Sequence, residues 1–168
     1  MNINFRHELP DDIDTISTLT AAAFQHAEHS SHTEQFIVNA LRRADALSLS
    51  LVAERRGELL GHAAVSPVSI GNGVEGWYGL APVSVLPAYQ NQGIGSRLIR
   101  QLLAELREMG AAGCVVLGNP HYYGRFGFDA QTSLTLPGVP QAYFRAITFR
   151  GALPQAEVAF HRAFDAIE

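Results

Sequence analysis

A loop with two glycines, Gln90–Ser96, lies between an apolar run and a long amphipathic segment. The run before it, Val83–Leu86, is typical of a strand, and the apolar spacing after Gly93 predicts a helix. The first N–H groups of a helix have no partner within it, and the helix dipole adds positive potential there. Because Gly93 and Gly95 carry no Cβ, the backbone can approach an anion closely. The segment therefore predicts a site for a phosphate or pyrophosphate group.

Other glycine-rich loops fit this segment less well. A dinucleotide-binding turn needs a third glycine where Leu98 stands, and an acidic residue some 20 positions further on, where Gly113-Cys114-Val115 is found. A P-loop needs Gly-Lys followed by Ser or Thr, which the sequence lacks. Local spacing alone also allows a plain turn before a packing helix.

Two motifs together resemble the GNAT N-acetyltransferase superfamily. Val83–Gly95 is similar to its acetyl-CoA motif, Val-x-Pro followed by Gln/Arg-x-x-Gly-x-Gly/Ala. Leu117–Phe128 is similar to its second motif. Within it, the sequence Tyr-Tyr-Gly-Arg-Phe-Gly-Phe most resembles the YhbS-like branch of the superfamily. The motifs are correctly ordered and about 25 residues apart, and the expected element order matches over nearly the whole chain.

The resemblance implies acetyl-CoA as co-substrate and no metal. It implies that the backbone N–H of Val83 stabilises the oxyanion of the tetrahedral intermediate, and that the backbone of Val85 pairs with the pantetheine amides. Amides from Gln92 to Ser96 would hold the pyrophosphate, with the Ser96 hydroxyl as a further donor. Where relatives often carry Arg or Lys, this loop has Asn91, so it must rely on amides. The cofactor-binding residues implied are Val83, Ser84, Val85, Gln90, Asn91, Gln92, Gly93, Ile94, Gly95, Ser96, Asn119 and Tyr122.

Acid and base roles follow from the reaction that the resemblance implies. Tyr123 matches the position of the acid that protonates the departing thiolate, with Tyr122 as its rival and ring packing as the plain alternative. The attacking amine must lose a proton. His62, Glu75, His121 and water all stay open as the base.

The implied function is transfer of an acetyl group to a primary amine, directly and in a ternary complex. No acyl-enzyme is expected, because the only thiol, Cys114, lies in an apolar run. The acceptor is a small-molecule or protein amine, with a small molecule favoured, and use of longer acyl-CoAs stays open. The alternative is a non-catalytic module of the same fold that binds or senses acyl-CoA.

The pattern predicts an α/β fold with a mixed, mostly antiparallel central sheet, splayed central strands and flanking helices. Residues 1–168 are expected to form one N-acetyltransferase domain. Ser31 and Glu34 predict a capping box, and Leu47, Leu49 and Leu51 alternate with serines as in a strand with one buried face. The expected strands are 3–8, 47–51, 59–70, 75–85, 113–118, 128–136, 143–149 and 157–161, and the expected helices begin at Pro10, Ser31, Gly93 and Pro120.

Composition and charge argue against nucleic-acid-binding, membrane-bound and metal-binding proteins. The net charge is −4 and the basic residues are scattered arginines, which argues against a nucleic-acid partner. No long apolar run or signal-peptide core occurs, so we expect a cytoplasmic protein that is not bound to a membrane, as a monomer or homodimer. His26, His29 and His32 are spaced by three, but their polar surroundings favour a solvated loop over a metal site. By resemblance, this loop would border the acceptor.

Overall fold

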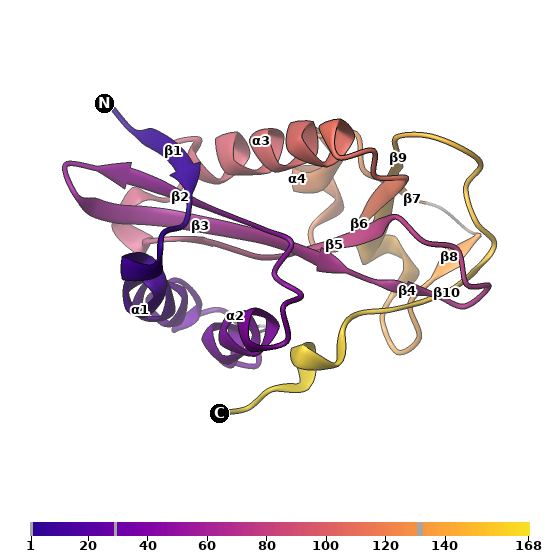
Figure 1. The fold of residues 1–168 in the computed structure, drawn as a ribbon, viewed down its shortest axis with the longest axis horizontal. Coiled ribbons are helices and arrows are strands. Elements are labelled where there is room, and N and C mark those ends of the chain that lie inside the picture. Colours follow the sequence, from indigo (N-terminus) through magenta and orange to yellow (C-terminus); the bar gives the residue numbers. More distant parts are fainter. Residues whose placement is uncertain (1, 29, 131–132) are drawn as a thin grey trace. The chain divides into compact units, whose positions relative to one another are not determined.

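The computed structural model describes residues 2–28, 30–130 and 133–168 (Figure 1). The chain divides into two compact units. Unit 1 holds the residues up to Val65 together with Ala81–Leu102 and Arg162–Glu168, and unit 2 holds Ser66–Leu80 and Leu103–His161. Three elements run from one unit into the other: β3 (Glu58–Pro67), β5 (Trp77–Val85) and α3 (Ile94–Glu108). In the part of the chain that is described, no helix is both long and apolar enough to cross a membrane.

Unit 1 is built on the strand order β1-β2-β3-β5. β1 pairs antiparallel with β2, and β2 pairs antiparallel with β3. Leu86 N–H donates to the Leu60 carbonyl at 2.9 Å, which joins the end of β5 to β3. The other elements of unit 1 are β1 (Asn4–His7), α1 (Ile13–Phe24), α2 (Glu34–Arg43), β2 (Leu49–Arg55) and the 3-10 turns η1 (Pro10–Asp12), η2 (Pro87–Tyr89) and η4 (Arg162–Asp165).

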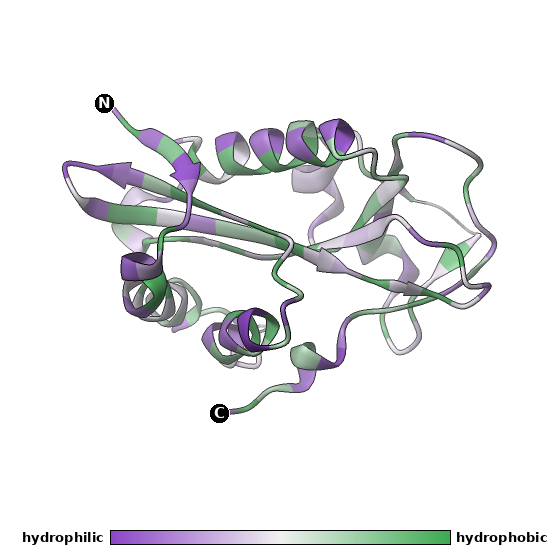
Figure 2. Cartoon of the chain, viewed as in Figure 1, coloured by the Kyte–Doolittle hydropathy of each residue, from purple (hydrophilic) through white to green (hydrophobic). Residues whose placement is uncertain are grey.

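Helices cover both faces of the sheet in unit 1. On one face, Ile16 and Leu19 of α1 pack in a buried cluster with Val52 of β2. On the other face, a Cβ added to Gly61 would lie 3.0 Å from Ile94 Cγ2, so the start of α3 sits directly on β3. Figure 2 shows the two sides of α3 as hydrophobic and hydrophilic stripes, as its apolar spacing predicted.

Unit 2 has the strand order β5-β6-β9-β7, with a small second sheet ordered β4-β10-β8. β6 is parallel to β5 and antiparallel to β9. Trp77 fills the core of this unit, and a Cβ on Gly113 would lie 2.4 Å from its ring. The elements are β4 (Ser69–Ile70), β6 (Gly113–Leu117), α4 (Pro120–Gly124), β7 (Asp129–Ala130), β8 (Leu134–Thr135), η3 (Gln141–Tyr143), β9 (Phe144–Thr148) and β10 (Ala156–Ala159).

The predicted fold class is confirmed: helices flank a mixed sheet in which most neighbours are antiparallel. One pair in this sheet, β5 with β6, is parallel. Its ladder runs from Trp77↔Gly113 to Gly79↔Val115, whereas β5 continues to Val85. A cofactor-binding gap beyond that point stays a prediction.

Three local predictions were wrong. The N-cap of α2 is Thr33 rather than Ser31, because the helix begins at Glu34. The serine that donates to the Glu34 carboxylate is Ser30, at 2.7 Å. The strand around Ser50 is buried on both faces rather than one, because β2 lies between β1 and β3 and helices cover it. The apolar spacing that predicts the helix after Gly93 continues to Met109, but Met109 follows the last helical residue and is half exposed.

Two long predicted strands are each divided. The strand expected over 59–70 forms β3 and β4, and the one expected over 128–136 forms β7 and β8. Within the second prediction, residues 131–132 lie outside the described part of the chain. The strand expected over 113–118 forms β6, which ends one residue early, and its last residue, Leu117, is 44% exposed.

Candidate active site

The predicted cofactor segment begins on β5. Val83 and Val85 are half-buried, while Ser84 between them is 1% exposed, as alternation along a strand requires. The chain then passes through η2. The Gln90 side-chain amide donates to the Val85 carbonyl at 3.0 Å, so it ties the loop back onto the strand.

The loop leads into α3, and the first backbone N–H groups of this helix make no i→i−4 hydrogen bond. Arg97 N–H donates to the Gly93 carbonyl at 3.1 Å, and α3 begins at Ile94. The N–H groups of Ile94, Gly95 and Ser96 therefore stand before the first i→i−4 bond. Gly93 has φ +85°, and a Cβ there would meet no atom within 4 Å, so open space adjoins the backbone. These features satisfy the local requirements of an anion site.

An arginine that sequence reasoning missed reaches this loop. Arg55, the last residue of β2, donates from Nη2 to the Tyr89 hydroxyl at 2.8 Å, and its guanidinium carbon lies 5.0 Å from the Tyr89 ring centroid. The loop sequence around Asn91 contains no Arg or Lys, but Arg55, at the end of β2, places a positive charge beside Tyr89 at the start of the loop. The 34 positions between Arg55 and Tyr89 hide this contact from any local pattern.

A cavity of about 360 Å³ lies in unit 1 between the C-terminal end of α1 and the end of β5. His26 reaches it, whereas His32 is exposed with φ 60°, and His29 lies outside the described residues. The lining residues are Ala22, Ala23, Phe24, His26, Ala27, Val83, Val85, Pro87 and Gln90.

Tyr123, the predicted acid, belongs to α4 in unit 2. Its ring stands edge-on to Tyr122, with centroids 5.0 Å apart, and to Phe128, at 6.0 Å. Burial raises the pKa of Tyr123 to about 12, with smaller contributions from Tyr122 and Cys114. Such a phenol keeps its proton at neutral pH, as a proton donor must. Asn119, a predicted cofactor ligand, caps α4: its side-chain oxygen accepts from His121 N–H at 2.9 Å.

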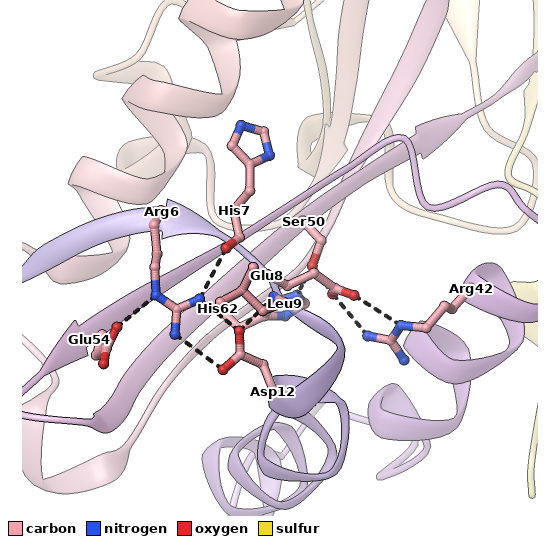
Figure 3. A network of polar contacts seen from close by, with 9 residues as sticks. All are labelled: Arg6, His7, Glu8, Leu9, Asp12, Arg42, Ser50, Glu54 and His62. Carbon is pink, nitrogen blue, oxygen red and sulfur yellow. Dashed lines mark hydrogen bonds and ion pairs between the residues drawn. The ribbon is translucent and has the colours of Figure 1, made fainter.

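The three candidate bases lie in different settings. His62 is fully buried on β3, and desolvation lowers its pKa to about 4. Glu75 and His121 are exposed. His62 Nε2 lies 2.8 Å from Ser50 Oγ, and the Ser50 hydroxyl donates to Glu8 (Figure 3).

The outer end of this polar group is an ion pair. Arg42 donates to both carboxylate oxygens of Glu8, at 2.9 and 3.1 Å. Burial opposes ionisation of Glu8, but hydrogen bonds from Arg42 and Ser50 hold the pKa of its carboxyl below the usual value. Beside it, Arg6 joins Asp12 at 2.7 Å and Glu54 at 2.6 Å (Figure 3). This second group ties β1 to η1 and β2.

Cys114 is fully buried in β6, as predicted, and burial raises the pKa of its thiol. A thiol in this state is a poor nucleophile, because the thiolate is the reactive form. Among the described residues, no cluster of His, Cys, Asp and Glu could hold a metal ion.

Comparison with known proteins identifies the class. Residues 13–128 match the Acetyltransferase (GNAT) family. The chain is 35% identical over 143 residues to the uncharacterized N-acetyltransferase YhbS of Escherichia coli (strain K12), covering 82% of this chain and 83% of that protein. The chain therefore belongs to the GNAT acetyltransferase family.

Two solved structures share its fold at high similarity. A GNAT family acetyltransferase from Brucella melitensis in complex with acetyl-CoA is 51% identical, with a TM-score of 0.88, and the match covers 98% of this chain and 99% of that one. YhbS from Escherichia coli in complex with CoA is 30% identical, again with a TM-score of 0.88, covering 100% of this chain and 94% of the other. The resemblance to the YhbS-like branch seen in the sequence is confirmed.

Proposed function

We propose that this protein transfers an acetyl group from acetyl-CoA to a primary amine, directly and in a ternary complex. The observation that carries the proposal is the start of α3, where backbone N–H groups stand free of i→i−4 bonds beside open space at Gly93. The acetyl-CoA and CoA bound by the two similar structures support the same cofactor here.

In this proposal the backbone does most of the binding. The N–H groups from Gln92 to Ser96 hold the pyrophosphate, and the backbone of Val85 pairs with the pantetheine amides. The Val83 N–H donates to the thioester carbonyl and stabilises the oxyanion that forms on attack. Arg55 adds positive charge beside the loop and supplies the cation that the loop sequence lacks.

Tyr123 is the proposed acid. The amine nitrogen forms a bond to the carbonyl carbon, the C–S bond breaks, and the sulfur takes the electron pair together with the phenolic proton. With a pKa raised to about 12, Tyr123 holds that proton until the thiolate forms. The ordinary thiol pKa of about 8.5 lies below that of Tyr123, so the thiol of free CoA returns a proton readily to the phenolate and resets the acid.

The acceptor is proposed to be a small-molecule amine with an apolar body, bound in the cytoplasm. Six of the nine residues that line the unit 1 cavity are alanine, valine or phenylalanine, and His26 and Gln90 supply its polar side chains. An apolar lining is typical of small-molecule pockets, in which a few polar groups set orientation.

Turnover with detection of the free CoA thiol tests the proposal. Acetyl-CoA is mixed with a panel of amines, and the acetylated product is identified by mass. Thiol release that depends on an amine is the expected result. Tight acetyl-CoA binding with no product from any amine would instead favour a binding or sensing module.

A further inference from the structure

One imidazole lines the unit 1 cavity that is assigned above to the acceptor. Eight of the nine lining residues are alanine, valine, phenylalanine, proline or glutamine, whose side chains take up no proton at neutral pH. The ninth is His26, and histidine is the side chain that most often serves as a general base. His62, the candidate base of the same unit, is fully buried and is not among the nine.

A tight turn after α1 fixes the place of His26. The helix ends at Phe24, and the Ala27 N–H donates to the Phe24 carbonyl at 3.1 Å, so His26 occupies the third position of the turn. Phe24 and Ala27 also line the cavity. The helix itself is anchored in the core by Ile16 and Leu19. The imidazole is therefore carried to the cavity by a packed helix.

The two sides of the cavity carry different parts of the proposed reaction. Val83, whose backbone is proposed to hold the thioester carbonyl, belongs to β5, whereas His26 follows α1. An attacking amine directs its lone pair at the carbonyl carbon, so its N–H bonds point away from that carbon. An amine bound between the two elements therefore turns its N–H bonds away from β5, toward the side that carries His26.

We propose that His26 is the general base that takes the proton from the attacking amine. This inference rests on the proposed acetyl transfer. As the N–C bond forms, the nitrogen becomes positively charged, and one of its protons passes to a ring nitrogen of His26 while the N–H electron pair stays on the amine nitrogen. His26 is exposed, so the imidazolium can release this proton to solvent before the next turnover.

The neighbours of His26 do not compete with it for the proton. Gln90, the other polar residue of the lining, uses its side-chain amide to donate to the Val85 carbonyl, and an amide is not a base at neutral pH. Glu28, the nearest acidic residue in the sequence, is exposed and does not line the cavity. Within the described lining, the amine proton can therefore pass only to His26 or to water.

Replacing the imidazole tests the proposal. His26→Gln keeps a polar side chain that accepts no proton. It should lower kcat about 100-fold with every alkylamine that the wild-type protein acetylates, phenethylamine among those assayed, while acetyl-CoA affinity stays within about twofold. His32→Gln is the matched control, since His32 is exposed in the following loop and does not line the cavity. Wild-type kcat in folded His26→Gln, or equal losses in both variants, would overturn the proposal.

The basicity of the amine separates proton uptake from binding. Each accepted alkylamine is paired with its β,β-difluoro analogue, in which fluorine lowers the basicity of the nitrogen with little change of shape. After attack, the weakly basic nitrogen gives its proton readily to water, so His26→Gln should slow the analogue by no more than about tenfold. Added imidazole should restore part of the rate of His26→Ala with the parent amine. Equal losses for the two amines, or no rescue, would mean that His26 only binds the acceptor and would overturn its role as base.

Failure of this inference and failure of the proposed function give different results. Acetylation of an amine at a rate that does not depend on His26 would overturn the base role alone, and water would then take the proton. A wild-type protein that binds acetyl-CoA and acetylates no amine would contradict the proposed function, and the role of His26 with it.

Discussion

The ring of Tyr123 lies against the backbone of Gly118, so closely that a Cβ at position 118 would stand 2.5 Å from the Tyr123 Cε2. Gly118 follows β6 and Tyr123 lies on α4, and Gly118 N–H is itself held by the Tyr143 carbonyl at 2.9 Å. This hydrogen bond holds the backbone of Gly118 in place, so it cannot easily move away from the Tyr123 ring. Gly118, the second residue of the Leu117–Phe128 segment, therefore leaves the space that the Tyr123 ring occupies.

Gly118→Ala should displace this ring and lower kcat by about tenfold or more, because a misplaced catalytic group loses its alignment. Overpacking should also cost about 1–3 kcal/mol of unfolding free energy. Gly124→Ala, on α4, is the control, since a Cβ there meets no atom within 4 Å. Steady-state kinetics and urea unfolding measure both effects. Equal activity in the two variants would contradict the seating role.

Tyr123→Phe should lower kcat by roughly 100-fold while acetyl-CoA affinity is nearly unchanged, because only departure of the thiolate needs the hydroxyl. The acid works in its protonated form, and a pKa raised to about 12 means that this form is lost only as pH rises through that value. Wild-type kcat should therefore show no alkaline fall from Tyr123 below about pH 11. Tyr122→Phe is the companion variant. If it loses activity while Tyr123→Phe does not, Tyr122 is the acid.

Local patterns predicted the elements that carry the proposed cofactor site. The 3.6-residue period of Ile94, Leu98 and Leu102 and the glycine before it depend only on near neighbours, and all three side chains are buried in α3 as expected. The same is true of Cys114, whose apolar neighbours in sequence are also its neighbours in β6.

Contacts between distant segments escaped prediction. Ser50 was expected to face solvent because it alternates with leucines, but helices cover both faces of β2, and pairing of β1 with β2 brings Glu8 to it from 42 positions away. Arg55 reaches Tyr89 only because β2 ends beside the loop. Nothing in a local window distinguishes a buried serine that has a carboxylate partner from an exposed serine.

Stability should fall in mild acid because of His62. Its pKa is about 4 in the folded protein against an ordinary value of 6.5, so between these values the unfolded chain binds a proton that the folded chain excludes. The stabilisation that comes from a neutral His62 is complete above pH 6.5. As pH falls through this window, the free energy of unfolding decreases by up to about 1.4 kcal/mol per pH unit. Urea unfolding at pH 7, 6 and 5 measures the slope. His62→Gln should flatten it, and an unchanged slope would show that other groups cause the loss.

Gly93→Val should weaken acetyl-CoA binding, since its side chain would enter the space beside the free N–H groups. The φ of +85° makes any β-branched residue strained there, at a cost of about 1–2 kcal/mol. Gly73→Val is the control for this strain, with φ +81° and equally open surroundings, on a turn that is not part of the loop. Both should lose similar stability, and calorimetry should show weaker binding only for Gly93→Val. Equal affinities in the two folded variants would contradict the phosphate site.

Cys114→Ala should keep most of the activity, which separates direct transfer from an acyl-enzyme route. The thiol is fully buried in β6 and burial raises its pKa, so little thiolate exists to attack a thioester. Loss of the sulfur should cost about 1 kcal/mol of packing, to be read from urea unfolding. Intact mass after mixing wild-type protein with acetyl-CoA alone should show no added acetyl group. A stable adduct that disappears in Cys114→Ala, together with loss of turnover in that variant, would establish a covalent intermediate and remove the need for a ternary complex.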